Sequence, residues 1–239
     1  MKKTLPLALF LTLFLSSCIL DTKYVAEPFD GKVLPRICGY QTGVTHDWIY
    51  FNLRTGEVFN AKAPNQDIRE GEQKSREDWD LAFCGYHMRT NGGTSGPGKG
   101  AAADLGAIEY TEITTRAQLP QELRWVTDDD HSVYIAWSQN DWYSMLAKEG
   151  MSEDDYPWFD PNAGIRTTLT SGNALLDESI TISGPPIIYT PNFHTYLIRT
   201  ADGTGIYKLQ IVNWFDSSAP IGDTGGRISY YLDELKNEE

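Results

Sequence analysis

Short strand-like segments separated by glycine-containing turns constrain the fold of this chain more than any other feature of its sequence. The clearest pair, residues 195–199 and 206–212, flanks an Ala-Asp-Gly-Thr-Gly turn and is typical of a β-hairpin. A second pair, residues 46–53 and 57–59, is joined by a Thr-Gly turn. The sequence therefore predicts antiparallel strands connected by tight turns.

Further strands are expected along the chain, whereas signals for helices are scarce. The other strand candidates are residues 79–83, 107–115, 131–137 and 227–232. The best helix candidate is residues 141–149, with Asp141 as N-cap and Gly150 as the stop. Seven Trp, 13 Tyr and 9 Phe also favour β-structure. We expect an all-β fold, a single antiparallel domain over residues 34–239 with at most one or two short helices.

The beginning of the chain has the pattern of an export signal. Two lysines precede an apolar run over residues 5–15, which is too short for a membrane-spanning helix. The Leu-Ser-Ser-Cys sequence that ends at Cys18 resembles the lipobox of bacterial lipoproteins, in which the cysteine thiol carries the lipid. We expect a signal peptide over residues 1–17 and a lipidated tether over residues 18–33. The alternative is a plain signal peptide with an incidental cysteine.

The charge of the chain excludes one class of partner. Its formal net charge is −13. Nucleic-acid binding depends on cationic contacts to phosphate, so this surface is expected to repel nucleic acid. No later segment is apolar enough to be a membrane span, and we expect membrane attachment through the lipid anchor only.

Cys38 and Cys84 are the two cysteines that follow the predicted lipidation site. An exported protein meets an oxidising compartment, where paired thiols tend to form a disulfide. The sequence leaves two alternatives open. Either a disulfide ties the N-terminal segment to a core strand, or both residues are buried free thiols.

A glycine-rich segment, residues 89–102, comes close to a nucleotide-binding motif. Gly93 to Lys99 has the spacing of a P-loop, but the next position must be Ser or Thr to hold magnesium and here it is Gly100. We expect instead a loop or extended passage whose backbone needs positive φ or a close approach to a neighbour.

The sequence lacks the patterns of common catalytic and metal sites. Three Cys and four His do not make a Cys/His-rich zinc scaffold, and no Gly-x-Ser-x-Gly elbow is present. The acidic runs at residues 128–130 and 153–155 have no EF-hand pattern, so we interpret them as solvated loop acids rather than calcium ligands. We expect a protein that binds a partner and is not an enzyme.

Three blocks of sequence carry a resemblance to a known family. The first is residues 48–59, a strand that ends in a Gly-Glu-Val turn. The second is Asp-Trp-Asp-Leu-Ala-Phe at residues 78–83, followed by Arg89, Asn91 and the glycines up to Gly100. The third comprises Arg199, the turn at residues 201–203, residues 208–211 and the closing strand after Gly226.

These blocks resemble the HmuY family of exported haem-binding lipoproteins from Gram-negative anaerobes. The resemblance covers most of residues 46–232, with a poorly matched middle. It implies an all-β fold shaped like a hand, with haem held between loops.

The resemblance also implies where axial haem ligands should lie. In the family a pair of His or Met side chains from two middle loops holds the iron. The first loop falls near residues 138–146, where Met145 is the candidate. The second falls near residues 182–185, which contain neither His nor Met, so Met151 is the candidate for the second ligand. In the alternative reading, Met145 belongs to the core and Met151 to the surface or to packing.

Aromatic residues gather between residues 137 and 158, and Trp142 and Tyr143 are candidates to stack on a haem face. Lys148 and Arg166 could pair with the propionates. A hydrophobic loop packed over the sheet is the alternative. The four histidines are interpreted as structural, turn or strand-edge residues: His46, His87, His131 and His194.

We therefore expect a lipid-anchored protein of the outer membrane or cell surface. Its expected function is to bind haem or a related tetrapyrrole for uptake, with an outer-membrane haem transporter as partner. Its axial ligand pair would be non-standard or incomplete. The alternative is a surface adhesion or structural lipoprotein of the same fold that does not bind haem.

Overall fold

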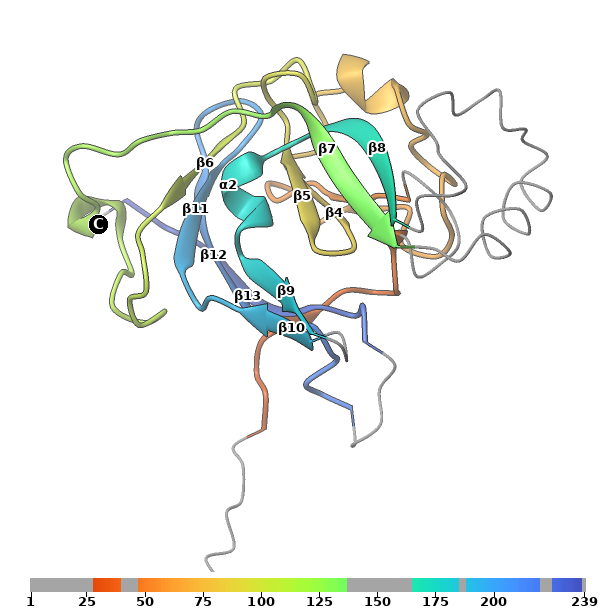
Figure 1. Ribbon diagram of the computed structural model, residues 1–239. Coiled ribbons are helices and arrows are strands. Elements are labelled where there is room, and N and C mark those ends of the chain that lie inside the picture. The colour runs from red at the N-terminus through yellow and green to blue at the C-terminus, as the bar shows by residue number, and fades with distance from the viewer. Residues whose placement is uncertain (1–27, 40–46, 137–164, 185–187, 220–224, 238–239) are drawn as a thin grey trace, which may run out of the picture.

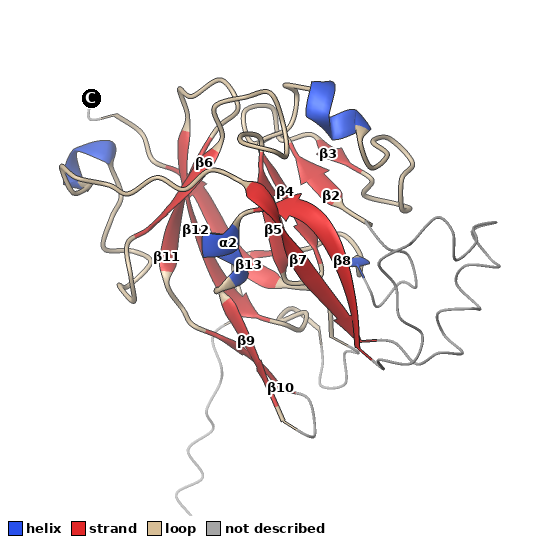
Figure 2. Cartoon of the chain, turned by 45° about the horizontal axis from the view of Figure 1, so that its top comes forward, coloured by secondary structure: helices blue, strands red, loops and turns tan. Residues whose placement is uncertain are grey.

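The computed structural model describes residues 28–39, 47–136, 165–184, 188–219 and 225–237. Within them, antiparallel strands form a five-stranded sheet, a four-stranded sheet and two separate two-stranded hairpins (Figures 1 and 2). The five-stranded sheet has the order β1 (Lys32–Val33), β13 (Ser229–Glu234), β12 (Ile206–Asn213), β11 (Thr195–Arg199) and β6 (Ala101–Asp104). The four-stranded sheet has the order β3 (Val58–Phe59), β2 (Ile49–Phe51), β4 (Leu81–Cys84) and β5 (His87–Thr90).

The two hairpins and the short helices complete the described part of the chain. The hairpins are β7 (Asp129–Ala136) with β8 (Ile165–Gly172), and β9 (Ile180–Ser183) with β10 (Ile188–Pro191). The helices are α2 (Ala174–Asp177) and the 3-10 turns η2 (Glu72–Ser75) and η3 (Arg116–Gln118). In this part of the chain, no helix has the length and apolar character that a membrane crossing requires.

The all-β prediction is confirmed, and the strongest local signals are found where they were expected. Residues 195–199 and 206–212 form the β11–β12 hairpin, in which Thr195 pairs with Gln210. The strands predicted at residues 79–83, 131–137 and 227–232 correspond to β4, β7 and β13, with ends shifted by one or two residues. The helix predicted at residues 141–149 lies outside the described residues.

The strand predicted at residues 107–115 is wrong, because this segment forms turns. A side chain takes the place of a partner strand there. The Lys208 ammonium donates hydrogen bonds to the carbonyl oxygens of Tyr110 and Ile113 at 2.7 and 2.8 Å. These carbonyls are thus satisfied without a β-ladder, and Gly106, with φ 80°, turns the chain into the segment.

The five-stranded sheet begins slightly before the predicted domain boundary at residue 34. Lys32 pairs with Tyr230 and Val33 with Ser229, so the last two residues of the segment predicted as a tether form an edge strand. Just before them, the ring of Phe29 lies 5.5 Å from that of Tyr231.

The main core lies between the inner faces of the two larger sheets. Aromatic rings from both sheets meet there in edge-on or tilted contacts. Phe51 lies 5.8 Å from Phe83 and 6.4 Å from Tyr230, measured between ring centroids. These geometries add attraction to the burial of large apolar surfaces. A second buried cluster, on Trp48, Tyr50 and Trp79, packs beside the four-stranded sheet near η2, where the Trp79 indole donates to the carbonyl of Gln73.

The buried carboxylate of Asp80 joins the two larger sheets. Its Oδ1 accepts from the backbone N–H of Ala201, in the β11–β12 turn, at 2.7 Å. Its Oδ2 accepts from the backbone N–H of Leu53, in the β2–β3 turn, also at 2.7 Å. The guanidinium of Arg54 lies 3.2 Å away and offsets the buried negative charge.

Asn91 organises the glycine-rich segment. Its amide nitrogen donates to the carbonyls of Arg76 and Trp79, both at 2.8 Å, and its Oδ1 accepts from the backbone N–H of Gly98. A Cβ atom on Gly96 would lie 2.1 Å from Asn91 Oδ1, a distance at which atoms overlap. The expectation that this segment needs glycine for close backbone approach is confirmed.

Cys38 and Cys84 lie close together in the core as free thiols. The Cys38 sulfur lies 3.5 Å from the carbonyl oxygen of Phe83 and 3.4 Å from the backbone nitrogen of Gly85, the residues on either side of Cys84. Burial raises the pKa of the Cys38 thiol to about 12 and that of Cys84 well above its ordinary value. Both thiols are therefore protonated at neutral pH and poorly nucleophilic. Their oxidation to a disulfide stays a prediction of the sequence.

The two backbone hydrogen bonds that the Asp80 carboxylate accepts lead to a test of fold stability. Asp80→Ala leaves two buried backbone N–H groups without acceptors, each costing about 1–3 kcal/mol. We expect the free energy of unfolding, measured by urea titration of the chain from residue 18 onward, to fall by about 3–5 kcal/mol. Asp78→Ala is the control, since its exposed ion pair with Arg76 should contribute less than about 1 kcal/mol. Equal losses in the two variants would contradict the role of Asp80.

Candidate functional site

The predicted ligand loops leave the sheets from the ends of the two separate hairpins. In the first hairpin, the register runs from Asp129 opposite Gly172 to Ala136 opposite Ile165. Residues 137–164 follow that last pair and lie outside the described residues. The same holds for the predicted haem-site residues Met145, Met151, Trp142 and Tyr143, as it does for the lipidation residue Cys18.

The second predicted ligand loop closes the β9–β10 hairpin. Here Ser183 pairs with Ile188, and Gly184 turns the chain with φ 108°. Two apolar side chains are exposed at this end of the hairpin, Ile182 with 43% and Ile188 with 53% of its surface accessible. Ile182 is opposite Tyr189 and Ile188 is opposite Ser183, so the two exposed side chains lie on different faces of the hairpin.

A short joint, residues 173–179, connects the two hairpins. From this joint both hairpins extend toward the same end of the molecule in Figures 1 and 2. Asn173 caps α2 by accepting from the backbone N–H of Leu176, and its own N–H donates to the carbonyl of Met88 in β5. The joint is therefore fixed to the four-stranded sheet at its first residue.

Asp177 fixes the other end of α2 to the same strand. Its Oδ1 accepts from the backbone N–H of Met88 at 3.1 Å, and its Oδ2 lies 2.9 Å from Nδ1 of His87. His87 is buried, so this contact is shielded from water. The structural interpretation of His87 is consistent with this geometry, and His194 similarly places Nδ1 2.9 Å from Asp104.

Asp128 anchors the beginning of β7. Its side chain is 2% exposed and accepts from the backbone N–H and hydroxyl of Thr90 at 2.8 and 2.6 Å, and from the amide of Asn173 at 2.9 Å. Burial raises the pKa of the Asp128 carboxyl to about 6, although these hydrogen bonds lower it. The interpretation of residues 128–130 as solvated acids is thus wrong for Asp128, while Asp129 and Asp130 are exposed.

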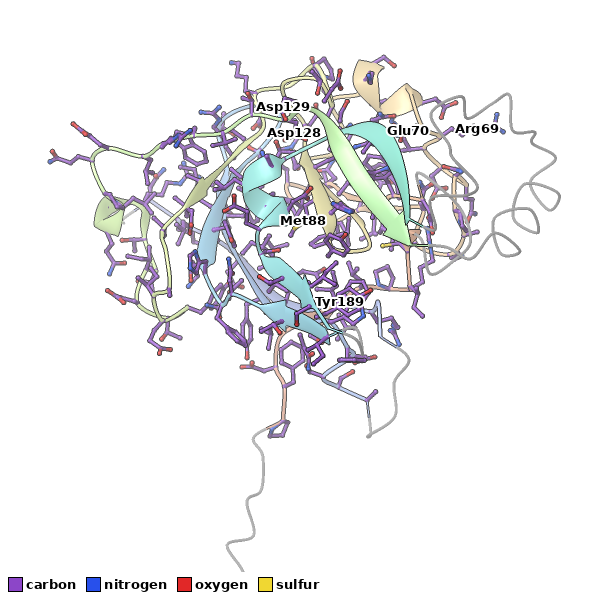
Figure 3. All side chains as sticks on the ribbon, viewed as in Figure 1. Arg69, Glu70, Met88, Asp128, Asp129 and Tyr189 are labelled. Carbon is purple, nitrogen blue, oxygen red and sulfur yellow. The ribbon has the colours of Figure 1, made fainter. Side chains whose placement is uncertain are left out.

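Arg89 anchors the end of β8 from inside the protein. Its fully buried guanidinium donates to the carbonyl of Ser171 at 2.7 Å and to the hydroxyl of Thr170. A two-pronged ion pair with Glu70, at 2.7 and 2.9 Å, and the ring of Trp48, at 3.8 Å, complete its surroundings. Figure 3 shows Glu70, Met88, Asp128 and Tyr189 spread along this scaffold, with Tyr189 toward the end to which the hairpins extend.

An aromatic cluster supports the β9–β10 hairpin. Tyr189 stacks on Trp214, with ring centroids 4.2 Å apart and planes 13° apart, and Tyr86 lies 6.3 Å from Tyr189. The cluster thus joins β10, the segment after β12 and the β4–β5 turn. It gives the hairpin that carries the second predicted loop an apolar support on the core.

The described residues offer little of their own to a metal ion. No group of three or more His, Cys, Asp or Glu side chains comes together within the described ranges. Met88 is fully buried in the core, and His87 and His194 each lie beside a carboxylate. The described residues therefore anchor the two hairpins and form no metal-binding cluster among themselves.

The sequence did not indicate the anchoring residues Asp128, Asn173, Asp177 and Arg89 as a group. Their partners lie 38 to 90 residues away along the chain, apart from the 19-residue separation of Arg89 and Glu70. The sequence around Arg89 and Asn173 is itself polar, so these residues did not stand out as buried side chains that must be paired.

Two antiparallel sheets with two anchored hairpins define the class of the protein as all-β. A family model described as HmuY protein matches residues 44–231, and the chain belongs to the HmuY family.

Two solved structures share the fold. The apo HmuY analog (TFO) of Tannerella forsythia aligns with a TM-score of 0.54 at 15% identity, covering 87% of this chain and 95% of that one. Apo PinO from Porphyromonas gingivitis aligns with a TM-score of 0.51 at 16% identity, covering 85% of this chain and 96% of that one. At these identities the likeness establishes the fold alone. No match is found among curated proteins.

The raised pKa of Asp128 predicts a pH-dependent stability. Its pKa is about 6 in the folded protein and 3.8 ordinarily, so the folded state binds more protons between about pH 4 and 6. Stability contributed by this group is present at low pH and is lost as pH rises through 6. The unfolding free energy of the parent, relative to Asp128→Asn, should fall by about 2–3 kcal/mol between pH 4 and 7.

Urea unfolding of both proteins across this pH range measures the difference. Asp129→Asn, the exposed neighbour, controls for the change in net charge. A parent-to-variant difference that stays constant with pH would show that the Asp128 carboxyl has the same pKa in the folded and unfolded states, and would refute the assignment.

Proposed function

We propose that this protein is an exported, lipid-anchored protein that binds haem or a related tetrapyrrole for uptake at the outer membrane or cell surface. The observation that carries the proposal is the arrangement of the two hairpins in a member of the HmuY family. Both predicted ligand loops leave from hairpins that share one joint and extend toward the same end of the molecule. A flat ligand held from two sides needs such a pair of supports.

The described residues fit the apolar part of a tetrapyrrole. Ile182 exposes apolar surface on the same face of β9–β10 as Tyr189, which is supported by Trp214, and Ile188 exposes apolar surface on the other face. Most of a small-molecule site is apolar, with few polar groups that fix orientation. This fit favours a ligand with a large apolar face.

The iron ligands in this proposal come from one loop. Of the three methionines beyond the start residue, Met88 is fully buried, which leaves Met145 and Met151. Residues 180–191 contain no His or Met, so that hairpin supplies contact surface rather than an axial ligand. Trp142 and Tyr143 would stack on the ring, and the ligand set would be non-standard or incomplete.

The protein would bind haem as cargo and pass it to a partner without catalysing a reaction. A thioether is a soft donor and favours ferrous over ferric iron. The bound haem would therefore be held more tightly after reduction. An outer-membrane haem transporter is the expected recipient.

Haemin titration tests the site. We expect one equivalent to shift the Soret band, and the affinity to rise at least about tenfold, or about 1.4 kcal/mol, on reduction with dithionite. Met145→Leu should remove most of this gain, because leucine preserves the apolar volume and lacks the sulfur lone pair. Met88→Leu is the matched control in the core and should retain it.

Two outcomes would decide against the proposal. Unchanged reduced spectra and affinity in Met145→Leu would remove this residue from the site. A parent protein with no haem spectrum in either oxidation state would favour the adhesion or structural reading, which the absence of His and Met from residues 180–191 supports.

Lipid attachment is tested at Cys18. Metabolic labelling with a fatty-acid probe should mark the parent and not Cys18→Ala, because no other thiol follows the apolar run directly. Cys38→Ala is the control and should be labelled like the parent. Equal labelling of Cys18→Ala and the parent would exclude this anchor.

A further inference from the structure

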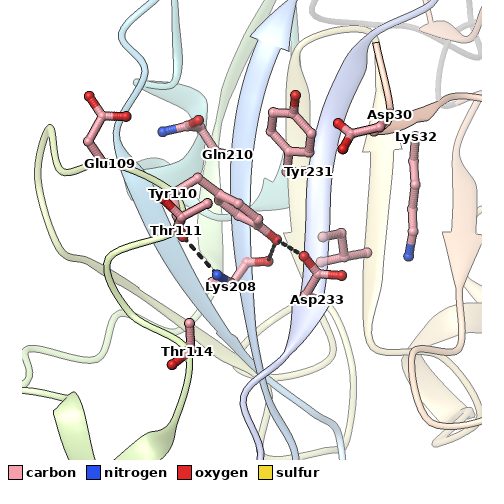
Figure 4. Close-up of a pocket in the computed structure, with 12 residues that line it drawn as sticks. Asp30, Lys32, Glu109, Tyr110, Thr111, Thr114, Lys208, Gln210, Tyr231 and Asp233 are labelled. Carbon is pink, nitrogen blue, oxygen red and sulfur yellow. Dashed lines mark hydrogen bonds between the residues drawn. The ribbon is translucent and has the colours of Figure 1, made fainter. Parts of the chain in front are cut away.

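A cavity of about 560 Å³ lies on the five-stranded sheet and is separate from the hairpins that carry the predicted haem loops. Its floor is formed by β12 and β13, and its sides by residues 30–32 and residues 109–114 (Figure 4). None of its lining residues belongs to β7, β8, β9 or β10. Its volume is in the range of about 300–1,000 Å³ that is usual for small-molecule sites.

Strand alternation directs polar side chains to this face of the sheet. Leu209 and Ile211 of β12 are buried in the core, so Lys208 and Gln210 point to the opposite face. In β13, the side chain opposite Gln210 is Tyr231, and the one opposite Lys208 is Asp233. The floor of the cavity is thus a two-by-two array of polar side chains.

One wall of the cavity is held in place before any ligand binds. The Lys208 ammonium binds the carbonyls of Tyr110 and Ile113 and lies 4.0 Å from the Tyr110 ring. The Tyr110 hydroxyl donates to Asp233 at 2.7 Å, and its ring stacks on Tyr231 with centroids 5.0 Å apart. A preformed wall reduces the entropy that binding would otherwise cost.

The lining combines groups that suit a neutral ligand rich in hydroxyls. Three carboxylates, of Asp30, Glu109 and Asp233, oppose an anion such as phosphate. The ammonium groups of Lys32 and Lys208 offset two of these carboxylates and oppose a cation, and the polar floor disfavours an apolar chain. Carboxylates accept hydrogen bonds from sugar hydroxyl groups. Amide and ammonium groups donate hydrogen bonds to the hydroxyl oxygens, and the accessible faces of tyrosine rings contact sugar C–H groups.

We propose that this cavity binds a short neutral saccharide, of the size of a disaccharide. Tyr231 forms the central contact surface, and Asp30 and Glu109 accept from sugar hydroxyls at the two ends. Figure 4 places Asp30 and Glu109 on opposite sides of Tyr231, so that a ligand reaching both must cross the tyrosine. The site is independent of haem binding, and a chain without haem affinity would retain it.

Saturation-transfer NMR with the full mature chain tests the proposal, using lactose, cellobiose and N,N′-diacetylchitobiose at millimolar concentration as probes. We expect saturation transfer to at least one of them. Tyr231→Ala should lower its affinity at least about fivefold. The matched control is Tyr207→Ala, in β12, whose side chain lines a different cavity on the other face of the sheet.

A second variant covers the case in which Tyr231→Ala does not fold. Asp30→Ala changes an exposed carboxylate and should weaken the same sugar without altering the thermal unfolding midpoint. No transfer to any of the three disaccharides would overturn the proposal. So would binding that both cavity variants leave unchanged, or binding of choline or inorganic phosphate at the cavity in place of the sugars.

Discussion

The described fold depends on one buried carboxylate, that of Asp80, which accepts a backbone hydrogen bond from a turn in each of the two larger sheets. Charged groups are costly to bury, and the cost is offset only where several donors converge with good geometry. Here the convergence fixes the sheets relative to each other, and the core aromatics Phe51, Phe83 and Tyr230 pack in the space that results. The glycines around Asn91 are required because the chain passes close to Asn91 itself, where a Cβ on Gly96 would overlap the side-chain oxygen of Asn91.

Buried and partly buried polar side chains fix the positions of the two separate hairpins. The bases of the hairpins are tied to the sheets by charged and polar side chains, Arg89 at β8, Asp128 at β7 and Asp177 at α2. Each of these groups is hydrogen-bonded in several directions, which restrains rotation as well as distance. Such anchoring fixes the bases of both hairpins to the four-stranded sheet and to the segment beside it.

Local signals in the sequence were sufficient to predict the β11–β12 hairpin, but they did not reveal the residues that anchor the two separate hairpins to the sheets. The β11–β12 hairpin was predictable because its strands and turn are contiguous in the sequence, and the turn residues favour a tight turn. The segment 107–115 was mistaken for a strand because its apolar content says nothing about Lys208, nearly 100 residues later, which captures its carbonyls. Asp128 looked solvated because burial is decided by Thr90 and Asn173, distant partners that a single sequence does not reveal. The resemblance to a family supplied the hand-like arrangement that local patterns could not.

The pairing of β1 with β13 has a consequence for the order of events during synthesis. Lys32 meets Tyr230, so the first described strand finds its partner only when almost the whole chain is available. The hydrogen bond between the Asp80 carboxylate and the backbone of Ala201 likewise joins residues that are 121 positions apart in the sequence. Contacts of such long range close large loops and form slowly. A partly synthesised chain therefore has no complete domain to fold into, because both long-range contacts need residues that are added near the end of synthesis.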